Sequence, residues 1–254
     1  MSEDYFLGAL DRLRAGRAAE LGCAPLDFDT HSLVITSRPP ASASKFLLMA
    51  VTFGTGTVCS VAPEYLDWVK SNAPEMHYRT LFPNVLLGPL VEEARARGES
   101  VGYRSPSLSF LPGSRPAALP MPHGITGRRV GPEFRQQHVQ SGVFDNALGE
   151  PGDDHVASLW RYGFALYSGE IPVAVAGTYH DYEGVSEIGI DVARSYRGIG
   201  LARVAVTNLA ALIDADGNIP SYYCSPTNVR SHRNALACGF LPVASIAWAM
   251  AQKS

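Results

Sequence analysis

A glycine-bearing turn in the C-terminal half of the chain joins a strand-like run to a helix-like run. It reads Arg197-Gly198-Ile199-Gly200-Leu201-Ala202, after the alternating residues of 185–192 and before the apolar repeat of 201–215. Glycine lets the backbone approach a phosphate closely, and the first turn of a helix presents unpaired N–H groups and a positive dipole end. Arg197 adds a fixed charge with paired donors. The segment predicts an anion site suited to a pyrophosphate.

Other interpretations of the same residues stay open at this point. A plain strand-to-helix turn with a solvated arginine would carry the same pattern. A Rossmann dinucleotide site is a second rival, but GxGxxG is absent and the preceding strands look antiparallel. A P-loop would need Lys and then Ser or Thr after the glycine, where this chain has Leu201 and Ala202.

A second segment narrows the choice. The residues Cys224 to Ser231 lead a predicted helix over 228–238, which Gly239-Phe240 follows. With this segment the chain resembles the GNAT superfamily of N-acetyltransferases. The family signature Q/R-x-x-G-x-G/A is matched from Arg197 to Ala202, and the family's later Asn and Gly-Phe are matched by Asn228 and Gly239-Phe240. The resemblance covers residues 122–254.

The residue pattern is closer to that of one subgroup, the GNAT enzymes that carry an extra N-terminal domain. Their pattern E-I-G-I, then Y-R-G-x-G-L-A, then N-x-x-S and G-F recurs here from Glu187 to Phe240. Two positions depart from it, because Tyr222 stands where Trp is usual and Val192 where Thr is usual.

The resemblance implies acetyl-coenzyme A as the cofactor. The backbone of Asp191, Val192 and Ala193 would bind the pantetheine arm, and Asn228 would contact the same arm, with Ser231 one helical turn further on. The pyrophosphate would lie against Arg197 and against the amides of Gly198, Ile199, Gly200, Leu201 and Ala202.

The chemistry needs a base for the attacking amine and a donor for the leaving thiolate. Glu187 is the favoured base, Asp191 is the fallback, and a purely structural role for Glu187 stays open. The family's usual acid is a tyrosine, but that position is Ala235 here. Cys224 is the committed substitute, and Tyr222 and Ser231 are the other candidates.

The periodicities predict a mixed α/β (α+β) fold. Expected strands are 123–130, 162–168, 171–182, 185–192, 220–224 and 240–249, with helices at 132–141, 201–215 and 228–238. This is a GNAT-like, largely antiparallel sheet flanked by helices. A smaller α/β domain precedes it, with a helix at 3–21, strands at 46–53, 55–61 and 101–111, and helices from 63 and over 84–97.

The proline-rich stretch 111–122 is the best linker in the chain. It divides the sequence into an N-terminal domain at 1–115 and an acetyltransferase domain at 122–254. In both halves of the chain a hairpin precedes a helix. The N-terminal domain is therefore a candidate for a degenerate copy of the GNAT-like half.

Composition narrows the class of partner. The net charge is −3 and no Lys or Arg run occurs, which speaks against nucleic acid and a polybasic membrane contact. No apolar stretch reaches the roughly 18 residues of a membrane span, and the N-terminus does not read as a signal peptide, so a cytoplasmic location is expected. The four scattered cysteines predict no metal site.

These observations lead to one functional hypothesis and a runner-up. The first is an acetyl-coenzyme A-dependent N-acetyltransferase that acts on a small-molecule amine by direct attack. The alternative is a catalytically quiet domain that binds or senses acyl-coenzyme A, which Ala235 favours. A longer acyl chain and a homodimer also stay open.

Overall fold

The structure is a computed structural model that describes residues 2–40, 46–73, 86–103, 106–182 and 184–251. The chain divides into two compact units. Unit 1 comprises Met1–Arg12, Phe110–Tyr223 and Val229–Leu241, and unit 2 comprises Leu13–Ser109, Cys224–Asn228 and Pro242–Ser254.

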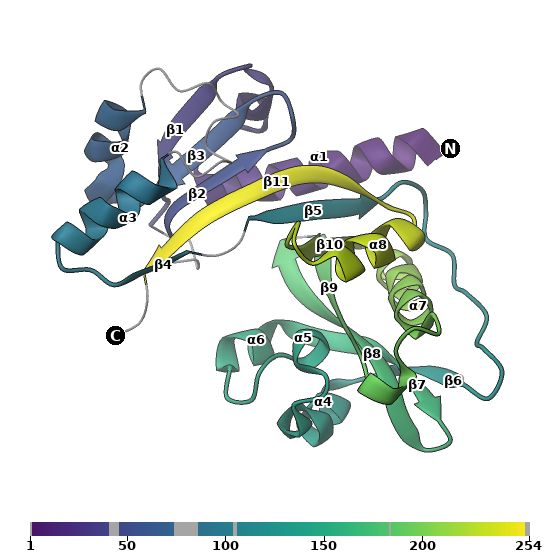
Figure 1. Ribbon diagram of the computed structural model, residues 1–254. Helices are drawn as coiled ribbons and strands as arrows, with labels where there is room; N and C mark the ends of the chain where they lie inside the picture. Colours follow the sequence, from purple (N-terminus) through teal and green to yellow (C-terminus); the bar gives the residue numbers. More distant parts are fainter. Residues whose placement is uncertain (1, 41–45, 74–85, 104–105, 183, 252–254) are drawn as a thin grey trace. The chain divides into compact units, whose positions relative to one another are not determined.

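The sheet of unit 1 is largely antiparallel, as predicted. Its strands are β6 (Thr126–Val130), β7 (Trp160–Ser168), β8 (Ile171–Tyr182), β9 (Val185–Val192) and β10 (Ile219–Cys224). Neighbours from β6 to β9 are antiparallel, and β10 lies parallel to β9 (Figure 1). The bounds of β9 are those predicted, because its alternating pattern ends in a turn on each side.

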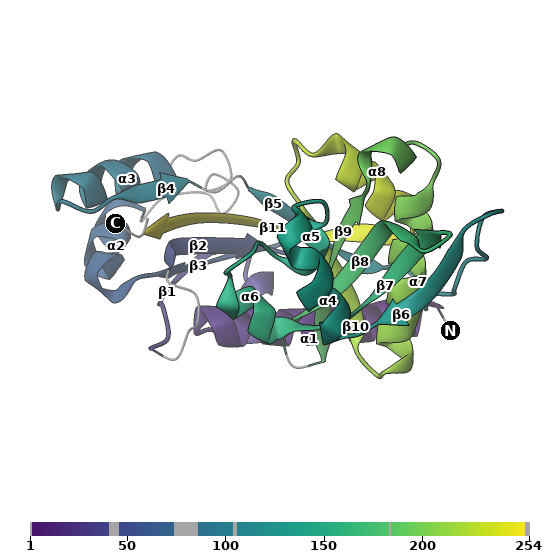
Figure 2. The ribbon, with the colours of Figure 1, turned by 90° about the horizontal axis from the view of Figure 1, so that it is seen from below.

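Helices cover both faces of this sheet (Figures 1 and 2). On one face lie α4 (Pro132–His138), α5 (Asp145–Leu148) and α6 (Asp154–Leu159), and on the other lie α7 (Leu201–Ala215) and α8 (Val229–Ala237). The buried residues of α7 include Leu201, Ala205, Leu209 and Ile213, which is the predicted apolar face. The sequence did not predict α5 or α6, because four or six residues are too few for a helical period.

Unit 2 has a sheet portion of its own. Its strands are β1 (Leu33–Ser37), β2 (Phe46–Thr52), β3 (Thr57–Val61), β4 (Val101–Tyr103) and the part of β11 (Phe240–Ala251) that follows Leu241. Strand β2 pairs with β3 and with β11, and β1 pairs parallel to β3. Two helices, α2 (Leu66–Asn72) and α3 (Leu87–Ala96), contribute to its apolar core.

Two predictions for the N-terminal half need correction. The expected strand over 101–111 is two strands, β4 and β5 (Ser107–Pro112), and Pro106 precedes the second. Proline lacks the N–H that a ladder requires, so a continuous strand was the wrong expectation. The structure also contains β1, which the sequence reasoning missed.

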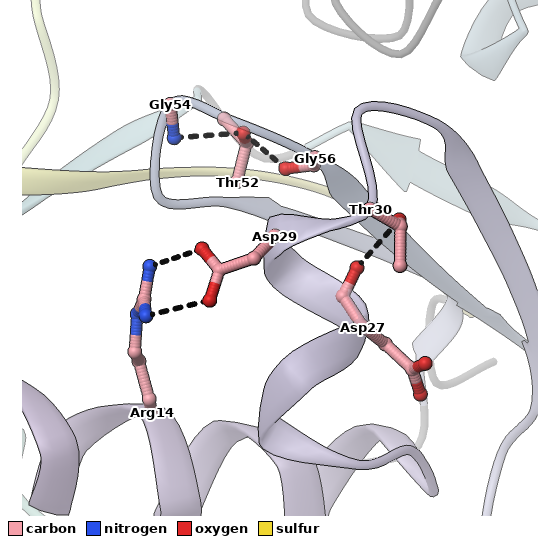
Figure 3. A network of polar contacts seen from close by, with 7 residues as sticks. All are labelled: Arg14, Asp27, Asp29, Thr30, Thr52, Gly54 and Gly56. Atoms are coloured by element: carbon pink, nitrogen blue, oxygen red, sulfur yellow. Dashed lines mark hydrogen bonds and ion pairs between the residues drawn. The ribbon is translucent and has the colours of Figure 1, made fainter.

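Figure 3 shows how the hairpin of unit 2 is fixed. The predicted Gly54-Thr55-Gly56 turn does join β2 to β3, and the Thr52 hydroxyl accepts from the Gly54 amide and donates to the Gly56 carbonyl. A side chain at Gly56 would lie 2.9 Å from the Phe28 carbonyl, so the 3-10 helix η1 (Pro25–Asp29) packs closely there. Arg14 holds Asp29 at the end of η1 through two hydrogen bonds of 3.1 and 2.8 Å.

The units interleave along the chain. The helix α1 (Ser2–Leu21) contributes residues up to Arg12 to unit 1 and residues from Leu13 to unit 2. The domain ranges 1–115 and 122–254 therefore stay a prediction about independent folding. Among the described residues, none of the helices is long and apolar enough to cross a membrane.

Candidate functional site

The predicted anion loop is open and lies at the start of a long helix. Gly198 and Gly200 both have φ of +87°, a left-handed conformation that favours glycine, and a Cβ at either position would meet nothing within 4 Å. Ile199 between them is 64% exposed. The fifteen-residue α7 begins without a side-chain cap or an acidic residue in its first turn. Its amides can therefore receive an anion, which fits the pyrophosphate of coenzyme A.

Arg197 is fixed beside this loop. Its Nε donates a 2.9 Å hydrogen bond to the Val192 carbonyl at the end of β9. One of the five guanidinium N–H groups is thus used within the protein, and the side chain is held over the junction between strand and loop. This geometry is compatible with the predicted phosphate contact, which stays a prediction.

Strands β9 and β10 pair over only part of their length. Their parallel register runs from Val185–Ile219 to Ile188–Tyr222, and β9 continues four residues further, to Val192. In the described residues this register gives Gly189 to Val192 no partner on the β10 side. An extended ligand arm could bind this edge as an additional strand.

The hydrogen-bond pattern between β8 and β9 shows which backbone groups of β9 face that edge. The Ala193 amide donates to the Val173 carbonyl of β8 at 2.9 Å, so it is engaged within the sheet. Because main-chain groups alternate along a strand, Asp191 also turns its amide toward β8, whereas Ile190 and Val192 turn theirs toward the β10 side. Of the three predicted backbone contacts, Val192 has the required orientation, and Ile190 is a candidate that the sequence reasoning missed.

Glu187 lies half-buried on β9, between Tyr179 of β8 and Ser221 of β10 in the register. Burial is the main cause that raises the pKa of Tyr179, and the negative charges of Glu187 and Asp191 raise it further. The Tyr179 hydroxyl donates to the Asn146 carbonyl at 3.2 Å. Tyr179 is a neighbour of the favoured base that the sequence could not identify, because it depends on the β8–β9 register.

Asp191 has a structural role that weakens its candidacy as the fallback base. Its carboxylate accepts three hydrogen bonds, from the Asn146 amide at 2.7 Å, the Asn146 side chain at 2.8 Å and the Ala147 amide at 3.0 Å. Burial raises the pKa of Asp191, and these three bonds oppose that rise. The side chain therefore fixes the start of α5 against the sheet.

Glycines allow α5 to lie directly on the strands. Gly163, Gly177 and Gly189 are register partners across β7, β8 and β9. A Cβ would lie 1.8 Å from the Ala147 carbonyl oxygen at Gly177 and 1.8 Å from the Asn146 carbonyl oxygen at Gly189. The Trp160 indole also donates to the Ala147 carbonyl at 2.9 Å. We call these three glycines the packed glycines; two of them, Gly177 and Gly189, let the backbone of α5 lie against β8 and β9.

Of the three candidates for the thiolate donor, Tyr222 and Ser231 lie together, and Cys224 belongs to the other unit. The Tyr222 hydroxyl lies 2.6 Å from the Ser231 hydroxyl, and Ala235 is completely buried. Cys224 is buried at the end of β10 and Asn228 is exposed, and both fall in the segment Cys224–Asn228 of unit 2. The roles of Cys224, Asn228 and Ser231 stay predictions.

Comparison with known proteins finds a family match for the part of the chain that contains these residues. Residues 128–240 match the model of the acetyltransferase (GNAT) family. A GCN5-related N-acetyltransferase from Kribbella flavida is 16% identical, with 97% of this chain and 96% of that chain covered at a TM-score of 0.50. No curated protein matches the chain.

Two further solved structures are more distant in shape. A GCN5-related N-acetyltransferase-like protein from Streptococcus suis 89/1591 is 18% identical over 63% of this chain and 67% of that chain, with a TM-score of 0.47. An aminoglycoside N-acetyltransferase in complex with coenzyme A is 17% identical over 49% of this chain and 93% of that chain, with a TM-score of 0.38. The match over residues 128–240 thus supports a GNAT acetyltransferase domain in this part of the chain, and GNAT acetyltransferases use acetyl-coenzyme A as their cofactor.

Proposed function

We propose that the protein is an N-acetyltransferase that acetylates the amine of a small-molecule acceptor by direct attack. The observation that carries this proposal is the combination of an open anion loop with a gap between two strands. The edge of β9 after Ile188 has no pair on β10, and the loop at 198–200 follows the end of this strand in the chain. Together they fit a ligand that has a diphosphate at one end and an extended amide arm at the other.

Each part of the cofactor has candidate residues. The amides of the loop and of the first turn of α7, from Gly198 to Ala202, would hold the pyrophosphate together with Arg197. The amide and carbonyl of Ile190 and Val192 would bind the arm, with the Arg197 contact to the Val192 carbonyl giving way or being shared. When bound, the cofactor supplies an acetyl group activated as a thioester.

The residues around Glu187 would prepare the acceptor. Glu187 would take a proton from the ammonium group, directly or through a water molecule, because an amine attacks only when its lone pair is free. Tyr179 lies beside Glu187 in the register and is anchored by Asn146. Glu187 lies on the same face of β9 as Gly189, which packs against α5, and next to Ile188, the last residue of β9 that pairs with β10.

The alternative of a quiet acyl-coenzyme A-binding domain rests on one observation. Ala235 is completely buried and offers no donor at the position where the family usually has its acid. Binding without turnover would be the outcome that this alternative predicts, and transfer of a longer acyl chain would appear as turnover with longer thioesters only.

The test is a calorimetric titration of the full chain with acetyl-coenzyme A, followed by a thiol-release assay against a panel of amines. Binding with release for at least one amine would support the proposed N-acetyltransferase. Binding without release, for acetyl and longer acyl thioesters alike, would favour the quiet domain. No binding would overturn the assignment of the 197–202 loop.

A further inference from the structure

A buried serine lies beside the proposed base in the sheet. Ser221 of β10 is 0% exposed, and in the part of the chain that the structure describes its hydroxyl has no hydrogen-bond partner. Its register partner across the parallel pair is Glu187 of β9. A buried hydroxyl that makes no hydrogen bond costs free energy, so it calls for a partner that the side chains around it can supply.

The serine and the glutamate lie on the same face of the sheet. Register partners of neighbouring strands point to the same side, whereas successive residues of one strand point to opposite sides. Gly189 packs against the backbone of α5, so Glu187, two residues earlier, is on the α5 face. Tyr222 has its hydroxyl 2.6 Å from that of a serine of α8, on the other face, which puts its neighbour Ser221 on the α5 face as well.

Reach and chemistry make the carboxylate a suitable partner for the serine hydroxyl. Neighbouring strands lie about 4.8 Å apart, a span that a glutamate side chain crosses by rotation about its own bonds. Glu187 is only half-buried and Ser221 is enclosed, so the carboxylate is the member of the pair with room to move. An ionised carboxylate only accepts hydrogen bonds, and a serine hydroxyl has one proton to donate.

Other polar groups on this face come from both neighbouring strands, from β9 itself and from two helices. The titratable and charged ones around Glu187 are Tyr179 of β8, Asp191 of β9, Tyr223 of β10, Arg135 of α4 and Asp145 of α5. The Tyr179 hydroxyl donates its proton to a carbonyl of α5, and Asp191 is an acceptor that takes three hydrogen bonds from the same helix. Ser221 is a donor beside Glu187 whose proton no other group takes in the described residues.

We propose that Ser221 is a positioning residue for the base, and that its hydroxyl donates a hydrogen bond to the ionised carboxylate of Glu187. This inference rests on the proposed function. The bond stabilises the charged form of Glu187, which is the form that can take a proton from the acceptor amine. Ser221 keeps its own proton throughout, and it forms and breaks no covalent bond.

Direct titration of Glu187 tests the pair without an acceptor. The full chain is labelled with carbon-13 at its glutamate side-chain carboxyl groups, and the signals are followed by NMR as a function of pH; the signal missing from Glu187→Gln identifies the residue. Ser221→Ala should raise the pKa of Glu187 by about one pH unit, because the charged form loses a donor. Ser221→Thr retains the hydroxyl and should keep the wild-type value.

A second buried hydroxyl provides the matched control. Thr178 is 1% exposed, its hydroxyl has no partner among the described residues, and it pairs with Ile188, on the face opposite to Glu187. Thr178→Val should leave the titration of Glu187 unchanged. Ser221→Cys is close to serine in size and donates weakly, so it should raise the pKa by less than alanine does, and it replaces the alanine variant if a urea titration shows that variant to be unfolded.

Two results of the titration would overturn the inference. One is the same pKa of Glu187 in wild type and in the serine variant that lacks the hydroxyl, and the other is an equal rise in Thr178→Val.

Thiol release connects the pair to catalysis. For an amine that wild type acetylates, the acid limb of the pH profile of kcat/KM should move upward in Ser221→Ala by the same amount as the titration. A shifted titration with an unshifted acid limb would overturn the positioning role. Absence of thiol release by wild type with every amine would instead contradict the proposed function, and the NMR titration would still decide whether the hydrogen bond exists.

Discussion

Two groups of glycines in unit 1 serve opposite purposes. Gly198 and Gly200 lie in the anion loop with φ of +87° and open space where a side chain would be. The packed glycines lie inside strands, and at Gly177 and Gly189 the backbone of α5 occupies that space. Glycine therefore leaves open space for the proposed anion in one region and makes room for the protein's own helix in the other. Variants in the loop should change binding, and variants in the packed region should change chemistry or folding.

Replacing the base should give the largest effect. Glu187→Gln removes the proton acceptor in the packed region, and general-base catalysis contributes about 10²- to 10⁴-fold, so kcat should fall by that factor. Affinity for acetyl-coenzyme A should stay unchanged, because the side chain is not part of the loop. Steady-state kinetics together with calorimetry would measure both quantities. Unchanged turnover at every pH would move the base elsewhere.

Filling the space beneath α5 should be the next most severe change. Gly189→Ala puts a Cβ where the Asn146 carbonyl oxygen is only 1.8 Å away, so α5 must move off the sheet. Overpacking of this kind costs about 3 kcal/mol of unfolding free energy, which urea titration would detect. Gly8→Ala is the matched control, since a Cβ there meets nothing within 4 Å in α1 and should stabilise the helix slightly. Equal stability of the two variants would refute the close packing.

Removing the loop's positive charge should affect binding alone. Arg197→Ala should weaken coenzyme A binding by about 1.5–3 kcal/mol, the range for a hydrogen bond to a charged group. The urea midpoint should change little because the side chain is exposed. Calorimetry gives the affinity, with Arg203→Ala, an exposed arginine further along α7, as the comparison variant. Equal affinities for wild type and Arg197→Ala would remove this residue from the site.

A side chain in the open loop should have the smallest effect on folding. Gly200→Ala adds a Cβ that meets nothing within 4 Å but must adopt φ near +87°. A left-handed conformation costs about 1–2 kcal/mol for an L-residue, so the unfolding free energy should fall by less than in Gly189→Ala. Urea titrations of both variants would show whether open and occupied glycines differ. A larger loss for Gly200→Ala would reverse the comparison.

Much of this architecture could be predicted from the sequence, and the reason is periodicity. The strand at Val185–Val192 and the helix at Leu201–Ala215 have the predicted limits, because alternation, a glycine turn and a helical repeat follow one another. The helices α5 and α6 are too short for a period to be recognised, whereas β1 was missed although its sequence, LVITS, has the β-branched residues typical of a strand. The break before Ser107 had a visible signal in Pro106, which a stricter use of proline rules would have found.

The site could be predicted only where it is continuous in sequence. The loop at 197–202 could be predicted as an anion site because its glycines and arginine are adjacent, and that role stays a prediction. The neighbours of Glu187, the orientation of Ile190 and the role of Asp191 depend on which strands pair and in what register. No spacing within a single segment contains that information, so Tyr179 and Ile190 emerged only from the structure.

The interleaving of the two units has a consequence for synthesis on the ribosome. Strand β2 spans Phe46–Thr52, but its partner β11 spans Phe240–Ala251 and is therefore made much later. The strands of unit 2 therefore cannot all pair until β11 has emerged, and until then one edge of β2 has no partner strand. We expect the nascent N-terminal half to be the part that needs protection from aggregation, and C-terminal truncation to harm the half that was made first.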